Sequence, residues 1–220
     1  MKIYNNLQIR EKHRNSVIAI GNFDGLHLGH QKLFNLAQLY KKKFKLKIGV
    51  INFNPMPKMF FNKNLKNFRI SNQNQKISLL KKLNVDFVII KKFNKEFSKI
   101  KSINFIKKII SEKLKPKFIF VSNNFRYGNK REGNVKELIK YETFYNYKII
   151  KPKPLSKNKK IISSSLIRKC LQNGKLKDAN KFLNREWAID GKVFKGRQLG
   201  KKIGFPTANI DIKDYILACP

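Results

Sequence analysis

Short, unbroken apolar runs recur along the chain, and segments with helical periodicity separate them. A run without polar alternation is typical of a strand buried on both faces, as in a parallel sheet covered by helices. Such alternation predicts an open α/β sheet whose ligands bind outside the carboxyl ends of its strands. The expected strands are residues 16–20, 48–51, 87–90, 118–121 and 147–150.

Apolar residues at three- and four-residue steps predict helices after residue 30, over 77–83, over 103–110, and as a closing pair broken at Asn173-Gly174. From Asn184 onward the chain changes character, because glycines at 196, 200 and 204 accompany short strand signals. We therefore expect two domains, residues 1–184 and 185–220. A segment of about 35 residues is too short to hold a core unaided, so the second domain is expected to be incomplete.

The composition excludes a disordered or disulfide-rich protein. Hydrophobic residues make up 41% of the 220 residues, enough to fill a core, and there are two cysteines, Cys170 and Cys219. No secretory segment and no apolar run near the length of a membrane span is present in the sequence, so a cytoplasmic protein without a membrane partner is expected.

The formal net charge of +37 raises the alternative of a basic nucleic-acid-binding protein. That function predicts charge clustered on one face with interleaved aromatic residues, whereas the lysines here are scattered along the whole chain. We therefore expect no nucleic-acid partner, and a positive field that attracts nucleotides. The sequence leaves the oligomeric state open.

The segment 21–34, GNFDGLHLGHQKLF, lies between an expected strand and an expected helix. Free amide groups at a helix start attract phosphate, and Gly21, Gly25 and Gly29 allow close approach to the backbone. Two of the three histidines in the chain, His27 and His30, are three residues apart and are expected on one side of the loop. They are candidates to stabilise charge that develops on transferred phosphate, with a plain turn and helix cap as the alternative.

Two further segments carry candidate ligand contacts. Ser163, Ser164 and Ser165 open an expected helix, where hydroxyls either cap free amides or contact a ligand, and Arg168 lies one turn further on. The segment 124–127 follows a buried strand, so its amide and aromatic side chains are expected at the ligand edge of the sheet or in the core.

Five ordered segments resemble the prokaryotic bifunctional riboflavin kinases/FMN adenylyltransferases, or FAD synthetases, of the HxGH nucleotidyltransferase superfamily. Residues 21–30 are similar to the family's first motif, 53–57 to its FxPHP loop, 121–128 to VGx(D/N)FRFG, 162–168 to ISSTxIR, and 191–209 to the kinase opening GxVxxGxxxGRxxGFPTAN. Four residues depart from these patterns: Met56, Ser122, Ser165 and Lys201.

This resemblance implies a Rossmann-like adenylyltransferase domain followed by the start of a β-barrel riboflavin kinase domain. The implied reaction is attack by the phosphate of FMN on the α-phosphorus of ATP, giving FAD and pyrophosphate, with Mg²⁺ as cofactor. His27, His30 and Arg168 are the implied catalytic residues. The implied ATP and phosphate contacts are Gly21, Asn22, Phe23, Asp24, Gly25, Gly29, Ser164 and Ser165, and the implied flavin contacts are Pro55, Asn124, Phe125 and Arg126.

For the kinase half, the resemblance places Thr207 and Asn209 at a magnesium site, with riboflavin as substrate. The family's acidic residue for phosphoryl transfer lies beyond Pro220, so we expect no riboflavin phosphorylation by these 220 residues alone. A nucleotidyltransferase with another phosphate acceptor is the alternative, and the kinase-like segment argues against it.

Overall fold

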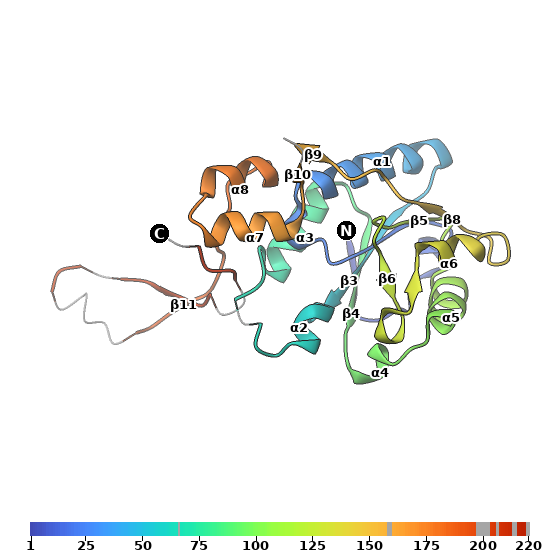
Figure 1. The fold of residues 1–220 in the computed structure, drawn as a ribbon, viewed down its shortest axis with the longest axis horizontal. Coiled ribbons are helices and arrows are strands. Elements are labelled where there is room, and N and C mark those ends of the chain that lie inside the picture. Colours follow the sequence, from blue (N-terminus) through green and yellow to red (C-terminus); the bar gives the residue numbers. More distant parts are fainter. Residues whose placement is uncertain (66, 158–159, 197–202, 206, 213–214, 219–220) are drawn as a thin grey trace.

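The computed structural model describes the whole chain except residues 66, 158–159, 197–202, 206, 213–214 and 219–220. At its centre is a six-stranded sheet in the order β1-β4-β3-β2-β5-β8, with every neighbouring pair parallel (Figure 1). The strands are β1 (Lys2–Tyr4), β2 (Val17–Ile20), β3 (Ile48–Asn54), β4 (Phe87–Lys92), β5 (Phe118–Phe120) and β8 (Lys148–Ile150).

Helices cover both faces of the sheet, as the unbroken apolar runs predict. One face packs against α1 (Leu28–Phe44) and α3 (Gln73–Lys82), through Phe34 and Leu80 among others. The other face packs against the π-helix Phe105–Leu114 and α6 (Val135–Lys140). Figure 1 shows α1 on one side of the sheet and α5 and α6 on the other. The remaining helices are α2 (Pro57–Phe61), α4 (Lys95–Ser98), α5 (Ser102–Asn104), α7 (Ser164–Gln172) and α8 (Leu176–Leu183).

The strand order reverses at β2, and such a reversal predicts where a ligand binds. The chain runs outward from β2 through β3 to β4, and then returns to the other side of β2 to form β5 and β8. Parallel sheets bind ligands at the carboxyl ends of the strands on either side of such a switch point. The segments that follow β2 and β5, residues 21–30 and 121–125, therefore meet at the expected binding edge.

The predicted α/β sheet is confirmed, and all five expected strands are present. The edge strand β1 is not predicted from the sequence, because Lys2 and Ile3 are exposed and only Tyr4 of its three residues is buried. Residues 103–110 are predicted as a helix, and the chain adopts π-helical geometry from Phe105. Apolar spacing does not distinguish these geometries, because both direct Ile106, Ile109 and Ile110 toward the sheet.

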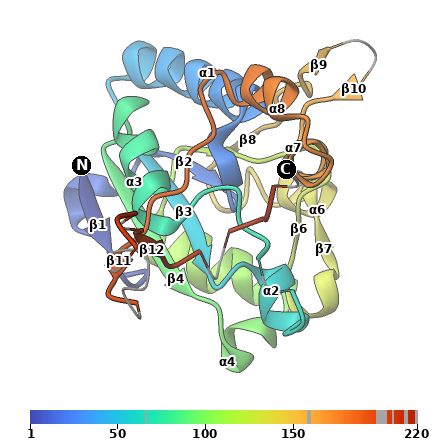
Figure 2. The ribbon, with the colours of Figure 1, turned by 90° about the vertical axis from the view of Figure 1, so that its left-hand side faces the viewer.

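The closing helices α7 and α8 form a small core of their own with Ile70 and Ile216. The segment after α8 then runs along α3, and Figure 2 views the molecule from this side. Trp187 Nε1 donates to Ile70 O at 2.9 Å, and Tyr215 OH donates to Gln75 Oε1 at 2.8 Å. The short ribbons are β6 (Arg126–Tyr127) with β7 (Gly133–Asn134), β9 (Ser156–Lys157) with β10 (Lys160–Ile161), and β11 (Val193–Phe194) with β12 (Asn209–Ile210).

Within the part of the chain that the structure describes, no helix combines the length and apolar character needed to cross a bilayer.

Candidate active site

The loop after β2 is a tight turn held against a distant segment of the chain. Residues Asp24–Leu26 form one turn of 3₁₀ helix, and Gly25 has a φ of +75°. A Cβ at Gly25 would lie 2.9 Å from Cγ2 of Ile70, so both the backbone conformation and the packing require glycine here. The loop ends at His27, the N-cap of α1, which places both histidines at the start of that helix.

Asp24 is the centre of this arrangement. Its side chain is 3% exposed and accepts hydrogen bonds from the amides of Ile70, at 3.1 and 3.2 Å, and Ser71, at 3.3 Å. It also forms an ion pair with Arg168, with Oδ2 2.5 Å from Nη2. These bonds hold the turn after β2 against residues 70–71 and α7.

Three contacts hold the Arg168 side chain in place. Besides the ion pair, Nε donates to Phe68 O at 2.8 Å, and the guanidinium lies 3.7 Å from the centroid of the Phe68 ring. Burial lowers the pKa of Arg168, and the neighbouring Asp24 carboxylate opposes that shift. The side chain is therefore a positioned cation whose remaining guanidinium edge is the part available to a ligand.

His27 and His30 form a stacked pair with ring centroids 3.7 Å apart and an interplanar angle of 22°. Burial lowers the pKa of His27 to about 4, against a smaller opposing effect of Asp24. Burial and the neighbouring His27 lower the pKa of His30 well below its usual value. Both rings are therefore neutral near pH 7, and the Nδ1 atom of each is buried without a hydrogen-bond partner. Two unpaired ring nitrogens at a helix start are suited to contact a ligand.

The three serines at the start of α7 differ in their contacts. Ser163 is the N-cap, and its Oγ accepts from Leu166 N at 3.2 Å. Ser164 Oγ donates to the backbone oxygen of Asp24 at 2.9 Å, which ties α7 to the turn after β2. Ser165 is exposed at the helix start. The structure thus brings Ser164 and Arg168 to the same loop as the histidines.

The candidate ATP contacts at the beginning of the loop are partly enclosed. Phe23 is buried against His30, with ring centroids 5.2 Å apart, and Asn22 O accepts from Asn52 Nδ2 at 2.9 Å. Gly29 lies beside the His27 ring, because a Cβ there would be 3.1 Å from its Nδ1 and Cε1 atoms. Gly21 is similarly close to the ring of Phe23.

The candidate flavin contacts lie on two different segments. Pro55 is half-buried and precedes Met56, which is only 1% exposed and is the N-cap residue of α2. Asn124 is exposed and accepts from Ser122 Oγ at 2.9 Å. Phe125 stacks on Tyr127 at 5.7 Å and packs against the core, whereas Arg126 is exposed on β6.

The candidate kinase ligands come later in the sequence than these residues, and they lie on the surface of the protein. Thr207 and Asn209 are both exposed, and Asn209 begins β12. The described residues contain no group of three or more His, Cys, Asp or Glu side chains that would hold a metal ion. Gly200, Lys201 and Pro206 of the kinase-like motif, and Cys219, lie outside the described residues.

Lys76, on α3, is a further candidate that was not predicted from the sequence. This lysine is 1% exposed, and its Nζ has no hydrogen-bond partner. Its pKa is lowered to about 8, chiefly by burial. A signal was present, because Lys76 lies four residues before Leu80 and seven before Leu83, on the apolar face of the helix. A charged residue in an apolar stripe is a candidate buried functional group.

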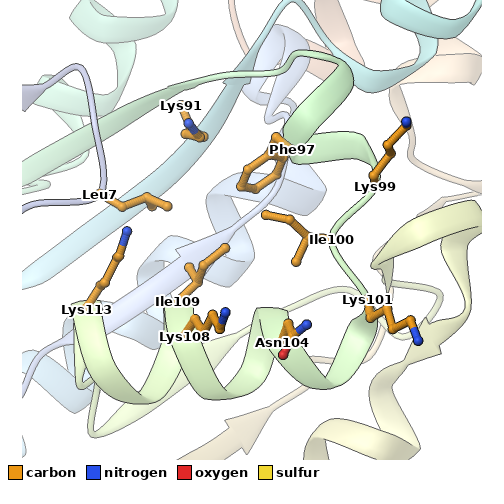
Figure 3. Close-up of a pocket in the computed structure, with 10 residues that line it drawn as sticks. All are labelled: Leu7, Lys91, Phe97, Lys99, Ile100, Lys101, Asn104, Lys108, Ile109 and Lys113. Atoms are coloured by element: carbon orange, nitrogen blue, oxygen red, sulfur yellow. The ribbon is translucent and has the colours of Figure 1, made fainter.

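A cavity of about 530 Å³ lies elsewhere, between the segment carrying α4 and the π-helix (Figure 3). Phe97, Ile100 and Ile109 point toward one another inside it, whereas Lys99 and Lys101 point outward (Figure 3). None of its lining residues belongs to the candidate active site.

Comparisons with known proteins agree with this arrangement. The FAD synthetase family model matches residues 9–166, and the riboflavin kinase family model matches residues 183–220. The chain is 41% identical over 219 residues to the bifunctional riboflavin kinase/FMN adenylyltransferase of Buchnera aphidicola subsp. Acyrthosiphon pisum, covering 99% of this chain and 70% of that protein. The protein of the same name from Escherichia coli K12 is 34% identical, with coverage of 91% and 64%.

A crystal structure described as a macrolide-efflux protein from Streptococcus pneumoniae superposes with a TM-score of 0.82 at 26% identity. The superposition covers 99% of this chain and 71% of the Streptococcus pneumoniae chain. The parallel sheet and the family match define a nucleotidyltransferase-like fold. More narrowly, the chain belongs to the family of bifunctional riboflavin kinases/FMN adenylyltransferases.

Proposed function

We propose that this chain transfers AMP from ATP to FMN, forming FAD and pyrophosphate. The observation that carries the proposal is the stacked pair of neutral imidazoles, His27 and His30, at the start of α1 beside the switch point of a parallel sheet. The family membership supplies the substrates, since the relatives are named for FMN adenylylation.

In the proposed reaction, a phosphate oxygen of FMN forms a bond to the α-phosphorus of ATP. The bond from that phosphorus to the oxygen bridging to the β-phosphorus breaks, and the electron pair leaves with pyrophosphate. A phosphate monoester is already anionic near pH 7, so its attack requires no general base. The protein's task is to align two anions and to offset the charge that develops between them.

Neutral imidazoles suit this task because each can donate a hydrogen bond to a phosphate oxygen bound at the N-terminus of a helix. Arg168 adds a fixed positive charge from α7, and its ion pair with Asp24 holds it beside the loop. The proposed phosphate and ATP contacts of the loop and of α7 are Gly21, Asn22, Phe23, Asp24, Gly25, Gly29, Ser164 and Ser165. The proposed flavin contacts are Pro55, Asn124, Phe125 and Arg126.

We propose that Mg²⁺ enters the site bound to the phosphates of ATP. Asp24, the buried carboxylate of the site, is already occupied by Arg168 and two backbone amides, so the described residues offer no carboxylate cage. Mg²⁺ commonly binds through substrate phosphates and retained waters, which fits this residue set. For the kinase segment, the Thr207 hydroxyl and the Asn209 amide oxygen remain the proposed magnesium ligands of an incomplete site.

The proposed domains are residues 1–184 for adenylyl transfer and 185–220 for the start of the riboflavin kinase. The buried free thiol of Cys170 suits the proposed cytoplasmic location.

The test is incubation of the protein with ATP, Mg²⁺ and either FMN or riboflavin, followed by chromatographic separation of the flavins. We expect FAD and pyrophosphate in equal amounts from FMN. A folded sample that binds ATP and yields no FAD contradicts the proposal. Nicotinamide mononucleotide and a pantetheine phosphate serve as competing acceptors, and adenylylation of either in place of FMN would assign a different acceptor.

A further inference from the structure

Lys76 carries a buried charge that no group in the described structure neutralises by contact. Its side chain is 1% exposed, and Nζ has no hydrogen-bond partner. The one carboxylate that acts on it, Asp24, is already ion-paired with Arg168. Since its pKa remains near 8, the ammonium is largely protonated at pH 7. Burying an unpaired ammonium group is unfavourable in free energy, and an anionic ligand bound beside it would offset that penalty.

The surroundings of Lys76 favour an anion as the missing partner. Asp24 acts electrostatically on Lys76, Arg168 and Arg185, so one carboxylate is shared by three cations. Arg69 and Arg168 further lower the pKa of Lys76, as expected for cations close to one another. The net charge of this buried cluster is therefore positive before any ligand binds.

Lys76 also acts electrostatically on the proposed reaction centre. It lowers the pKa of His30, which lies on α1 three residues after His27. Gln73 is three residues earlier on α3 and therefore on the same side of the helix, and neither its side-chain nitrogen nor its oxygen has a partner. Buried polar groups are normally paired, so unpaired atoms at Gln73, Lys76 and His30 mark one incomplete site.

We propose that Lys76, assisted by Gln73, binds the polyphosphate chain of the nucleotide from α3. This inference rests on the proposed function, which supplies ATP as the ligand. It adds a third segment to a phosphate site otherwise built from the loop after β2 and from α7. Because the polyphosphate is the recognised group, inorganic tripolyphosphate should bind through the same residue.

The test compares Lys76→Met with Lys81→Met in the full chain. Methionine keeps the length and apolar stem of the side chain but removes the charge, and exposed Lys81 lies on the same helix. By titration calorimetry we expect Lys76→Met to weaken ATP and tripolyphosphate by about tenfold or more, the scale of a lost charge-assisted hydrogen bond. Lys81→Met should bind both ligands as the unmodified chain does.

Thermal unfolding without ligand separates binding from a structural role. Replacing an unpaired buried charge by an apolar side chain should leave the unfolding temperature unchanged or raise it. A less stable Lys76→Met protein that binds ATP within twofold of the unmodified chain would overturn the proposal. Lys76→Arg, which keeps the charge, should recover part of the lost affinity.

A second measurement on the unmodified chain does not depend on any variant folding. The charged and titratable groups that interact electrostatically with Lys76 are Asp24, Arg69, Arg168 and His30. Because the pKa of Lys76 is about 8, binding of ATP at pH 8, where the ATP phosphates are already ionised, should be accompanied by proton uptake onto the Lys76 amine, measured in buffers of different ionisation enthalpy. Binding without proton uptake would overturn the proposal. Tight ATP binding without FAD formation would instead refute the proposed function and leave this inference standing.

Discussion

Asp24 Oδ2 lies 2.5 Å from Arg168 Nη2, joining two residues 144 positions apart in the sequence. The same carboxylate holds the amides of Ile70 and Ser71, so one buried side chain connects the turn after β2, the segment before α3, and α7. The turn leads into α1 with its two histidines, the second segment leads into α3 with Lys76, and α7 carries Arg168. The ion pair therefore sets the relative positions of the proposed phosphate-binding groups.

Replacing Asp24 by Asn should destabilise the protein. The substitution leaves the Arg168 guanidinium buried without its counter-charge, and breaking a buried pair from one side costs about 3 kcal/mol. Urea titration followed by circular dichroism measures the change in the free energy of unfolding. Lys169→Met, at the exposed neighbour of Arg168, is the matched control and should change stability little. A change below about 1 kcal/mol for Asp24→Asn would show that the pair is a weak, solvated one.

His27→Ala and His30→Ala should each slow FAD formation by about a hundredfold, the usual scale for removing one preorganised donor to developing charge. Steady-state rates at saturating ATP and FMN measure the effect. Lys32→Ala, an exposed position on the same helix, should leave the rate unchanged. If either histidine variant keeps the rate of the unmodified chain while folded, that histidine has no role in adenylyl transfer.

Acid should weaken the fold through His27. Its pKa is about 4 in the folded protein, lowered mainly by burial, against 6.5 for an unperturbed histidine. The unfolded chain therefore binds more protons between these values, and stability falls as the pH drops from 6.5 toward 4. One histidine contributes at most about 1.4 kcal/mol per pH unit in this window. His27→Gln should reduce the slope of unfolding free energy against pH by up to this amount, and an unchanged slope would contradict the assigned burial effect.

Trp187→Phe should loosen the contact between the segment after α8 and the site. The indole donates to Ile70 O at 2.9 Å, and Ile70 N in turn donates to Asp24. Loss of one hydrogen bond predicts about 1 kcal/mol less stability in urea unfolding. Phe194→Leu, at an exposed position on β11, serves as control and should have little effect. Equal stability of the two variants would indicate that this contact contributes nothing.

The sequence predicts the sheet well because β2, β3 and β4 are unbroken apolar runs, for which a doubly covered parallel sheet is the simplest packing. It also places Gly25 and the two histidines on one loop, because their spacing is local. It does not predict that Asp24 pairs with Arg168, since that contact depends on how α7 folds back over 144 positions. For Lys76 the sequence carries a signal, its place on the apolar face of α3, but only the packed structure shows that its Nζ is enclosed without a hydrogen-bond partner.

Labelling individual phosphorus atoms of ATP tests most directly whether the protein transfers AMP to FMN. With FMN and ATP labelled at the α-phosphorus, adenylyl transfer predicts that the label appears in FAD and none in pyrophosphate. With ATP labelled at the γ-phosphorus, all of the released label should be in pyrophosphate and none in a flavin. An α-label that is never found in FAD, from protein shown to be folded and to bind both substrates, would contradict adenylyl transfer by this site.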